Sequence, residues 1–96
     1  MTDRTERPLA VVCNPTKISD DLAGIVRDRA RDKGWSEPLW IETTADDPGR
    51  TAARQALDAG AELIFAAGGD GTVRAVAATV AGSEVPLAIV PAGTAN

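Results

Sequence analysis

Four short apolar runs, separated by segments in which apolar residues recur at helical spacing, constrain the fold of this chain most. The runs are Leu9–Cys13, Pro38–Glu42, Leu63–Ala67 and Leu87–Val90. Nearly continuous apolar runs of this length are typical of strands covered on both faces of a parallel sheet. The alternation predicts an α/β fold, a three-layer doubly wound parallel sheet of about four strands and three helices. The run Pro38–Glu42 is expected near a sheet edge, because proline lacks a donor.

The three predicted helices have recognisable ends. Ser19-Asp20-Asp21 would begin the first helix, whose apolar face consists of Leu22, Ile25, Val26 and Ala30. Trp35, which follows this helix, is expected to pack over its end. The glycines expected to stop the three helices are Gly34, Gly60 and Gly82.

Two adjacent acids precede the second helix. Asp47 is a candidate N-cap, with Pro48 at the first helical position. The alternative is a metal site formed by Asp46 and Asp47, but one capping acid and one solvated acid explain the pair more simply.

The segment Gly68-Gly69-Asp70-Gly71-Thr72 lies between the third apolar run and a helical pattern expected from about Thr72 to Val80. Free amides and the helix dipole converge at such an N-terminus, so the segment predicts a phosphate site. Its glycines would allow positive φ and close approach of a phosphate, and Thr72 fits an N-cap. Asp70 would repel phosphate unless a cation lies between them, which points to a Mg²⁺-complexed nucleotide. A plain glycine-rich turn with a solvated Asp70 is the alternative.

Right-handed crossovers would bring the carboxyl ends of all four strands to one edge of the sheet. Asn14, Thr43-Thr44, Gly68–Thr72 and Gly93–Asn96 would line that edge. Taken singly, Asn14 also fits an Asx-Pro turn, and the two threonines also fit an extension of their strand. Four polar or glycine-rich loops at one edge favour phosphate binding over these alternatives.

Composition excludes several kinds of function. The formal net charge is −4, from 10 Lys and Arg against 14 Asp and Glu, and no basic run is present, which argues against nucleic-acid binding. No histidine is present, so Ser-His-Asp catalysis and histidine zinc sites are excluded within the chain. The single Cys13 excludes an internal disulfide. No signal peptide or membrane-spanning run is visible, so we expect a cytoplasmic protein.

The motifs after the four runs resemble the diacylglycerol kinase catalytic domain family, in order and spacing. They are Asn14-Pro15, Glu42-Thr43-Thr44, Gly68-Gly69-Asp70-Gly71-Thr72-Val73 and Pro91-Ala92-Gly93-Thr94-Ala95-Asn96. That family includes bacterial lipid kinases, sphingosine kinases and ceramide kinases. NAD kinases share the glycine–aspartate motif and phosphofructokinases have a variant of it, whereas the Gly-Thr-x-Asn ending is far more specific to lipid kinases.

The resemblance implies a Rossmann-like, N-terminal ATP-binding domain over residues 9–96, preceded by a frayed segment, residues 1–8. The family's β-rich C-terminal domain, which carries its proposed catalytic base and the lipid acceptor site, would be absent from this chain. We therefore expect the 96 residues to be inactive alone and to self-associate through an uncovered part of the sheet. The full-length protein would lie in the cytoplasm or peripherally at the membrane.

Carried over by position, the resemblance implies a set of ATP contacts: Asn14, Thr44, Gly68, Gly69, Asp70, Gly71, Thr72 and Thr94. Asp70 would act through Mg²⁺ or by ordering the phosphate loop. The chain departs from the family at Thr16-Lys17-Ile18 and at Arg74-Ala75, where a small turn and Asn-Glu are usual. Lys17 and Arg74 would supply phosphate charge instead.

The predicted function is transfer of the γ-phosphoryl group of ATP to a lipid hydroxyl such as that of diacylglycerol. A NAD-kinase-like enzyme and a nucleotide-binding module without catalysis are the alternatives.

Overall fold

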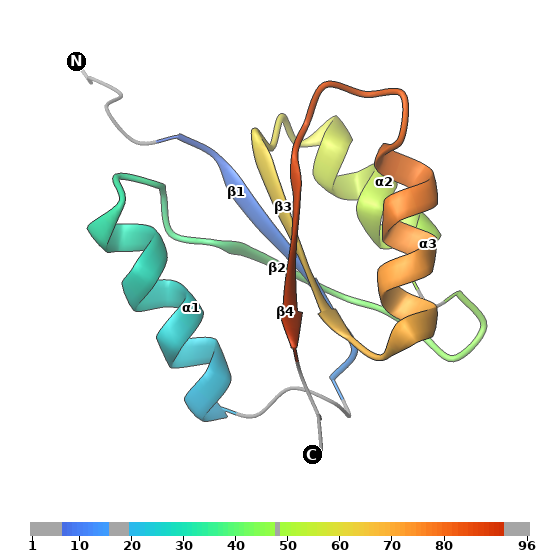
Figure 1. Cartoon of the computed structure of the whole chain (residues 1–96), viewed down its shortest axis with the longest axis horizontal. Helices are drawn as coiled ribbons and strands as arrows, with labels where there is room; N and C mark the ends of the chain where they lie inside the picture. Colours follow the sequence, from blue (N-terminus) through green and yellow to red (C-terminus); the bar gives the residue numbers. More distant parts are fainter. Residues whose placement is uncertain (1–6, 16–19, 48, 92–96) are drawn as a thin grey trace.

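The computed structural model of this chain describes residues 7–15, 20–47 and 49–91 (Figure 1). Strands and helices alternate throughout these residues, as predicted. The strands are β1 (Leu9–Cys13), β2 (Leu39–Glu42), β3 (Leu63–Gly68) and β4 (Leu87–Pro91). The helices are α1 (Asp20–Asp32), α2 (Arg50–Asp58) and α3 (Asp70–Val80).

The four strands form one parallel sheet in the order β2-β1-β3-β4. β1 lies inside the sheet, and all five of its residues are buried, as its continuous apolar sequence predicts. β2 is an edge strand, which confirms the expectation drawn from Pro38. Register is uniform across the sheet: Ala10 pairs with both Leu39 and Ile64.

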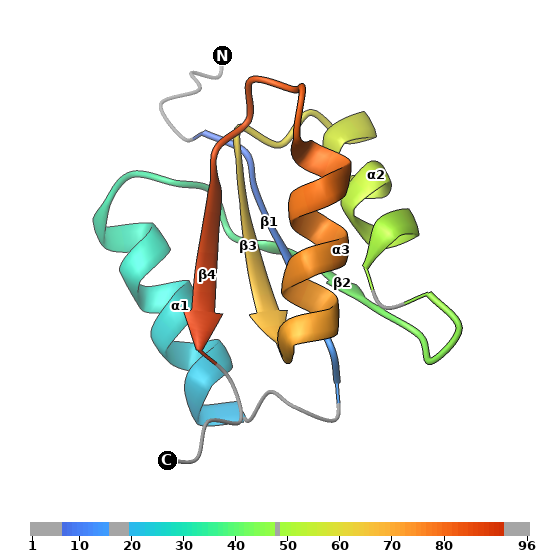
Figure 2. The ribbon, with the colours of Figure 1, turned by 45° about the vertical axis from the view of Figure 1, so that its right-hand side comes forward.

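Helices cover both faces of the sheet, so the predicted three-layer architecture is confirmed. α1 lies on one face, and α2 and α3 lie side by side on the other (Figures 1 and 2). The core between the sheet and α2 and α3 consists largely of small side chains, among them Ala10, Ala52, Ala53, Ala56, Ala66, Val76 and Val80. The core under α1 contains Val11, Cys13, Val26 and Ala67. Alanine at these contacts lets helix and sheet backbones approach closely.

Glycine ends the helices where expected. Gly34 and Gly60 have φ of 84° and 87°, the left-handed conformation that glycine adopts without strain. At the end of α1, the Gly34 N–H donates to Arg31 O and the Trp35 N–H to Ala30 O, which is the Schellman pattern. Gly82, after α3, also has a positive φ of 89°.

Two details of the helices differ from expectation. α3 begins at Asp70, with Gly69 as its N-cap residue, so Thr72 is not the N-cap. An acidic residue in the first turn is favourable beside the positive end of the helix dipole, which explains the earlier start. In α1, Val26 and Ala30 are buried as predicted, but Ile25 is 52% exposed. α1 is the only described helix on its face of the sheet, so Ile25 has no neighbouring helix to cover it. Ser19 lies outside the described residues.

The amino edge of the sheet is tied together by Arg7. Its guanidinium lies 4.3 Å from the centroid of the Trp35 ring, and its Nε lies 3.1 Å from Glu62 Oε1. The Ser36 N–H donates to Arg7 O, and the Glu62 N–H donates to Pro8 O. The segment expected to fray, residues 1–8, otherwise lies outside the described residues. Among the described residues, no helix is long and apolar enough to cross a membrane.

Candidate functional site

The carboxyl ends of the strands meet at one edge, and β-type pairing holds the residues that follow them. The Asn14 N–H donates to Ala67 O at 3.0 Å, and the Thr43 N–H donates to Cys13 O at 2.9 Å. Pairing therefore continues one residue beyond β1 and β2. It fixes Asn14 beside the end of β3, where the glycine segment begins, and Thr43 beside the end of β1.

Gly68 lies at the centre of this edge and has no room for a side chain. A Cβ atom at this position would lie 2.9 Å from Thr72 Oγ1 and 3.2 Å from Asn14 Cβ. Three residues predicted to share a site, Asn14, Gly68 and Thr72, are thus brought into contact. Thr72 is only 3% exposed, so its side chain packs beneath the glycine segment.

Gly69 and Gly71 lie in open space. A Cβ atom on either would meet no atom within 4 Å. The glycines of this segment do not adopt the positive φ that they would allow, because the positive-φ glycines among the described residues are Gly34, Gly60 and Gly82. Gly69 is extended, with φ −83° and ψ −172°, and the chain passes directly into α3. These glycines therefore leave a backbone that a ligand can approach.

The N-terminus of α3 has no side-chain cap, since Gly69 is its N-cap residue. The first amides of a helix have no partner within the helix, so here they are available to an anion. Asp70 is exposed in the first turn. Its carboxylate would lie close to any phosphate bound there.

The N-terminus of α2 is instead occupied by a carboxylate of the chain itself. Asp47 accepts hydrogen bonds from the Arg50 N–H at 2.8 Å and from the Thr51 N–H at 3.2 Å, and also from the Thr51 hydroxyl. The Thr51 hydroxyl, with the backbone N–H groups, holds the pKa of the Asp47 carboxyl below its usual range. Asp47 therefore caps α2 through its side chain, but the N-cap residue is Gly49 and α2 begins at Arg50, so the predicted N-cap position was wrong by two residues.

The metal alternative for the two acids finds no support. Asp46 is exposed, and the described residues contain no group of three or more acidic, cysteine or histidine side chains placed to hold a metal. Pro48 lies outside the described residues.

Of the two threonines after β2, only Thr44 is exposed, whereas Thr43 is 8% exposed. Thr44 Oγ1 accepts a hydrogen bond from the Asp47 N–H at 3.2 Å. A hollow of about 230 Å³, lined in part by Thr44, Asp47 and Gln55, lies beside this loop. Thr44 is therefore accessible at the carboxyl edge.

Three predicted site residues remain. Arg74 is exposed on α3, one helical turn after Asp70. Lys17 and Thr94 lie outside the described residues.

Sequence reasoning missed Gly49. A Cβ atom there would lie 3.1 Å from Thr72 O and 3.0 Å from Val76 Cγ2, so the start of α2 packs directly on the first turns of α3. A glycine between the turn residue Pro48 and a helical pattern was the available signal.

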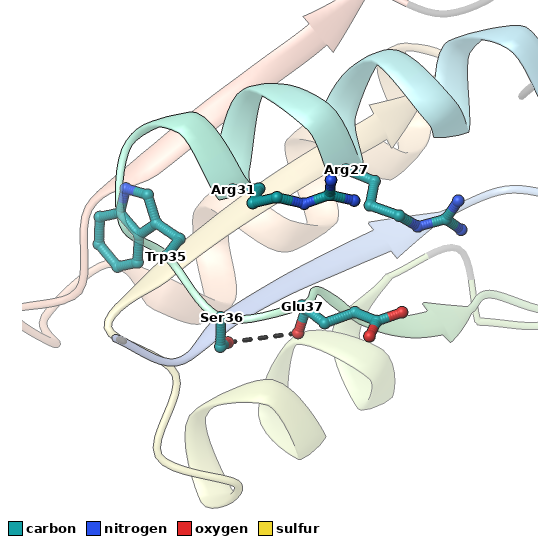
Figure 3. Close-up of a pocket in the computed structure, with 5 residues that line it drawn as sticks. All are labelled: Arg27, Arg31, Trp35, Ser36 and Glu37. Carbon is teal, nitrogen blue, oxygen red and sulfur yellow. Dashed lines mark hydrogen bonds between the residues drawn. The ribbon is translucent and has the colours of Figure 1, made fainter. Parts of the chain in front are cut away.

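A second hollow, of about 280 Å³, lies away from this edge (Figure 3). It is lined by Arg27 and Arg31 of α1 and by the segment Trp35–Glu37 that leads into β2. Trp35 packs over the end of α1 as expected, because its N–H donates to Ala30 O and its ring lies against Arg7. These residues lie at the amino edge of the sheet, so they belong to a different surface from the glycine segment.

A phosphate chain fits the carboxyl edge. Uncapped amides, two open glycines and a buried packing layer beneath them are the features that an anion site requires. A magnesium ion also fits, because Mg²⁺ commonly binds through one or two carboxylates together with phosphate oxygens and water. Asp70, exposed in the first turn of α3, is the carboxylate that would take this role.

Comparisons with known proteins bear on the family and the fold of the chain. Residues 8–96 match the model of the family described as the diacylglycerol kinase catalytic domain. Two curated relatives, both named "Probable lipid kinase YegS-like", come from Pseudomonas putida and Pseudomonas syringae pv. tomato. They are 37% and 36% identical over 92 and 98 residues, which cover 94% and 100% of this chain. The chain spans 30% and 31% of the lengths of these relatives.

A solved structure has the same fold. It is the crystal structure of a "putative diacylglycerol kinase" from Bacillus anthracis, with a TM-score of 0.64 and 23% sequence identity. The similarity covers 99% of this chain and 36% of that chain. The predicted fold class and family resemblance are both confirmed.

Proposed function

This chain belongs to the diacylglycerol kinase catalytic domain family, and from that membership we propose that residues 9–96 form the ATP-binding part of a lipid kinase. The proposed reaction transfers the γ-phosphoryl group of ATP to a lipid hydroxyl such as that of diacylglycerol. One observation carries the nucleotide part of the proposal: the N-terminus of α3 has no side-chain cap and opens at the edge where Asn14 and Thr44 lie.

The proposed roles follow from the backbone. The amides at the start of α3 would bind phosphate oxygens, and Gly69 and Gly71 would let the phosphates come close. Thr72, which is buried, would act through its backbone N–H and by supporting Gly68. Asn14 and Thr44 would contact the nucleotide from neighbouring strands, and Asp70 would hold Mg²⁺ together with the phosphates. Mg²⁺ supplies neutralisation of the charge that develops during phosphoryl transfer.

Further parts of the proposal concern charge and the acceptor. Lys17, Arg74 and Thr94 would add phosphate contacts. The catalytic base and the lipid site would lie outside residues 9–96, so the 96 residues alone would not turn over lipid. We propose a cytoplasmic or peripheral membrane location for the full-length protein.

A nucleotide-binding module without catalysis is the second candidate. It is favoured by Arg74-Ala75, which replaces the family's usual Asn-Glu, and by the packing of Ala75, whose Cβ lies 3.3 Å from the Cβ position of Gly49. The side chain of Ala75 therefore packs against Gly49, the N-cap residue of α2.

Two measurements test the proposal. Titration with Mg-ATP should shift the amide resonances of Gly68–Thr72, and chelation of Mg²⁺ should weaken the effect. The full-length protein should phosphorylate diacylglycerol, and Asp70→Asn should reduce the rate at least tenfold if it ligates Mg²⁺, on the order of the loss for one electrostatic contact in a transition state. Unmoved amide resonances would refute nucleotide binding at this edge. Binding without turnover, in both the natural protein and the variant, would favour the module.

A further inference from the structure

Asp47 joins two parts of the proposed nucleotide site that are separate in the sequence. Its carboxylate accepts hydrogen bonds from the N–H groups of Gly49 at 3.3 Å, Arg50 at 2.8 Å and Thr51 at 3.2 Å. Its backbone is paired with Thr44 in both directions, with N···O distances of 3.2 Å for each bond. The loop after β2 is therefore fastened to the N-terminus of α2 through a single residue.

This pairing determines how the Thr44 hydroxyl can act. Thr44 Oγ1 accepts the Asp47 N–H at 3.2 Å, so the hydroxyl is fixed as an acceptor toward its own loop. A hydroxyl has one proton to donate, and here that proton is free to point away from the loop. Thr44 is exposed at the carboxyl edge, so its hydroxyl is accessible as a donor to a ligand at that edge.

The hydrogen bonds of the Asp47 carboxylate to the start of α2 also affect the glycine segment, because α2 packs against α3. Gly49, which Asp47 holds, packs against α3 so closely that a Cβ there would lie 3.1 Å from Thr72 O and 3.3 Å from Ala75 Cβ. A shift in the start of α2 would therefore displace the first turns of α3, where the phosphate-binding amides lie.

We propose that Asp47 is a positioning residue of the nucleotide site: its carboxylate holds the loop that carries Thr44 to the N-terminus of α2 and seats α2 against the first turns of α3. This inference rests on the proposed function, because it names how that same site is held in shape. Asp47 itself does not contact the nucleotide.

The chain offers a matched control for the test. Asp46 is the adjacent residue, is exposed, and carries the same charge, so Asp46→Ala and Asp47→Ala change the net charge equally. Any general electrostatic effect on ATP is thus common to both variants. Asp47→Asn keeps an acceptor oxygen for the α2 amides and serves as the conservative rescue. Thr44→Val removes the hydroxyl and nearly preserves the side-chain shape.

Mg-ATP affinity is measured by calorimetry, and amide resonances are recorded without ligand. Asp47→Ala should raise the Kd for Mg-ATP about tenfold, on the order of the effect of losing one helix cap. Its ligand-free spectrum should show displaced resonances at residues 69–73. Asp46→Ala should stay within about twofold of the natural protein, and Asp47→Asn should recover most of the affinity. Thr44→Val should also weaken binding.

The outcomes separate the two hypotheses. If the natural protein does not bind Mg-ATP, the proposed function fails. If it binds and Asp47→Ala binds equally well, or if Asp46→Ala and Asp47→Ala lose affinity alike, the positioning role is overturned. Should Asp47→Ala fail to fold, Thr51→Val, which removes one hydroxyl donor to Asp47 and no charge, takes its place. Unchanged affinity and unchanged resonances at residues 69–73 in Thr51→Val would equally overturn the role.

Discussion

Gly68 and Gly69 are neighbours in the sequence, but their surroundings predict opposite consequences for substitution by alanine. At Gly68 the added Cβ would lie 2.9 Å from Thr72 Oγ1 and 3.0 Å from Thr72 Cβ, well inside van der Waals contact. Gly68→Ala should therefore destabilise the fold by about 1–3 kcal/mol, as overpacking of a closely packed site does. Gly69→Ala meets no atom within 4 Å and keeps an allowed backbone conformation, so its stability should change little.

Binding distinguishes the two variants further. The methyl group of Gly69→Ala would stand in the open space through which a phosphate approaches, so this variant should fold normally and bind Mg-ATP weakly. Thermal unfolding and ATP titration of both variants check the prediction. A fully stable Gly68→Ala protein would show that Thr72 and Asn14 can move apart.

Asp47 makes the stability of the second-strand loop depend on pH. Hydrogen bonds from the Thr51 hydroxyl and the backbone lower the pKa of the Asp47 carboxyl from 3.8 in the folded protein. A group with a lowered folded pKa contributes stability above its unfolded pKa, and that contribution is lost as pH falls through the folded pKa. The natural protein should thus melt at a higher temperature than Asp47→Asn at pH 6, with the difference shrinking below about pH 4. A difference independent of pH would exclude the carboxylate charge as its cause.

Two glycines, one inside α1 and one after its end, have equal space around them but different backbone conformations. Neither Gly24, inside the helix, nor Gly34, after its end, has an atom within 4 Å of its Cβ position. Gly24→Ala should stabilise the protein by about 0.5–1 kcal/mol, because alanine is the better helix former. Gly34→Ala should destabilise it by about 1 kcal/mol, because φ is 84° there. Urea unfolding measures both, and a stabilising Gly34→Ala would show that the chain can end α1 differently.

Elements that depend on local chemistry were predictable from the sequence, and those that depend on neighbours were not. Continuous apolar runs gave the strands, and Gly34 and Gly60 gave the helix ends, because a left-handed residue favours glycine whatever lies nearby. The exposure of Ile25 was not predictable, since periodicity identifies an apolar face but not how many helices share the sheet. The glycines of the segment Gly68–Thr72 are equally ambiguous in the sequence: Gly68 is required by its contact with Thr72, which is visible only in three dimensions.

The carboxyl edge was predictable as a gathering of loops but not as a packed site. Parallel strands and right-handed crossovers bring Asn14, Thr44 and Gly68 together in any fold of this class. The dependence of α3 on Gly49 arises from the contact between the start of α2 and α3, which lie side by side on one face of the sheet (Figure 1). Such tertiary contacts have no periodic signal in a single sequence.

At the scale of the whole molecule, strand β4 leaves an apolar side chain exposed at the margin of the sheet. β4 pairs only with β3 among the described strands, and Ile89, which pairs with Ala66, is 58% exposed. Exposed strand edges with apolar side chains favour association with another chain. The 96-residue chain should therefore self-associate as its concentration rises, and Ile89→Lys should shift it toward monomer.

Ile25→Lys is the matched control, because Ile25 is 52% exposed and lies on α1, away from the strand edge. Both variants add one positive charge and remove one exposed isoleucine, so a general effect of charge or hydrophobicity would appear in both. Sedimentation or light scattering across a concentration series should show association in the natural chain and in Ile25→Lys, and weaker association in Ile89→Lys. Equal dissociation in both variants would place the contact elsewhere than β4, and a monomeric natural chain at every concentration would refute self-association through this edge.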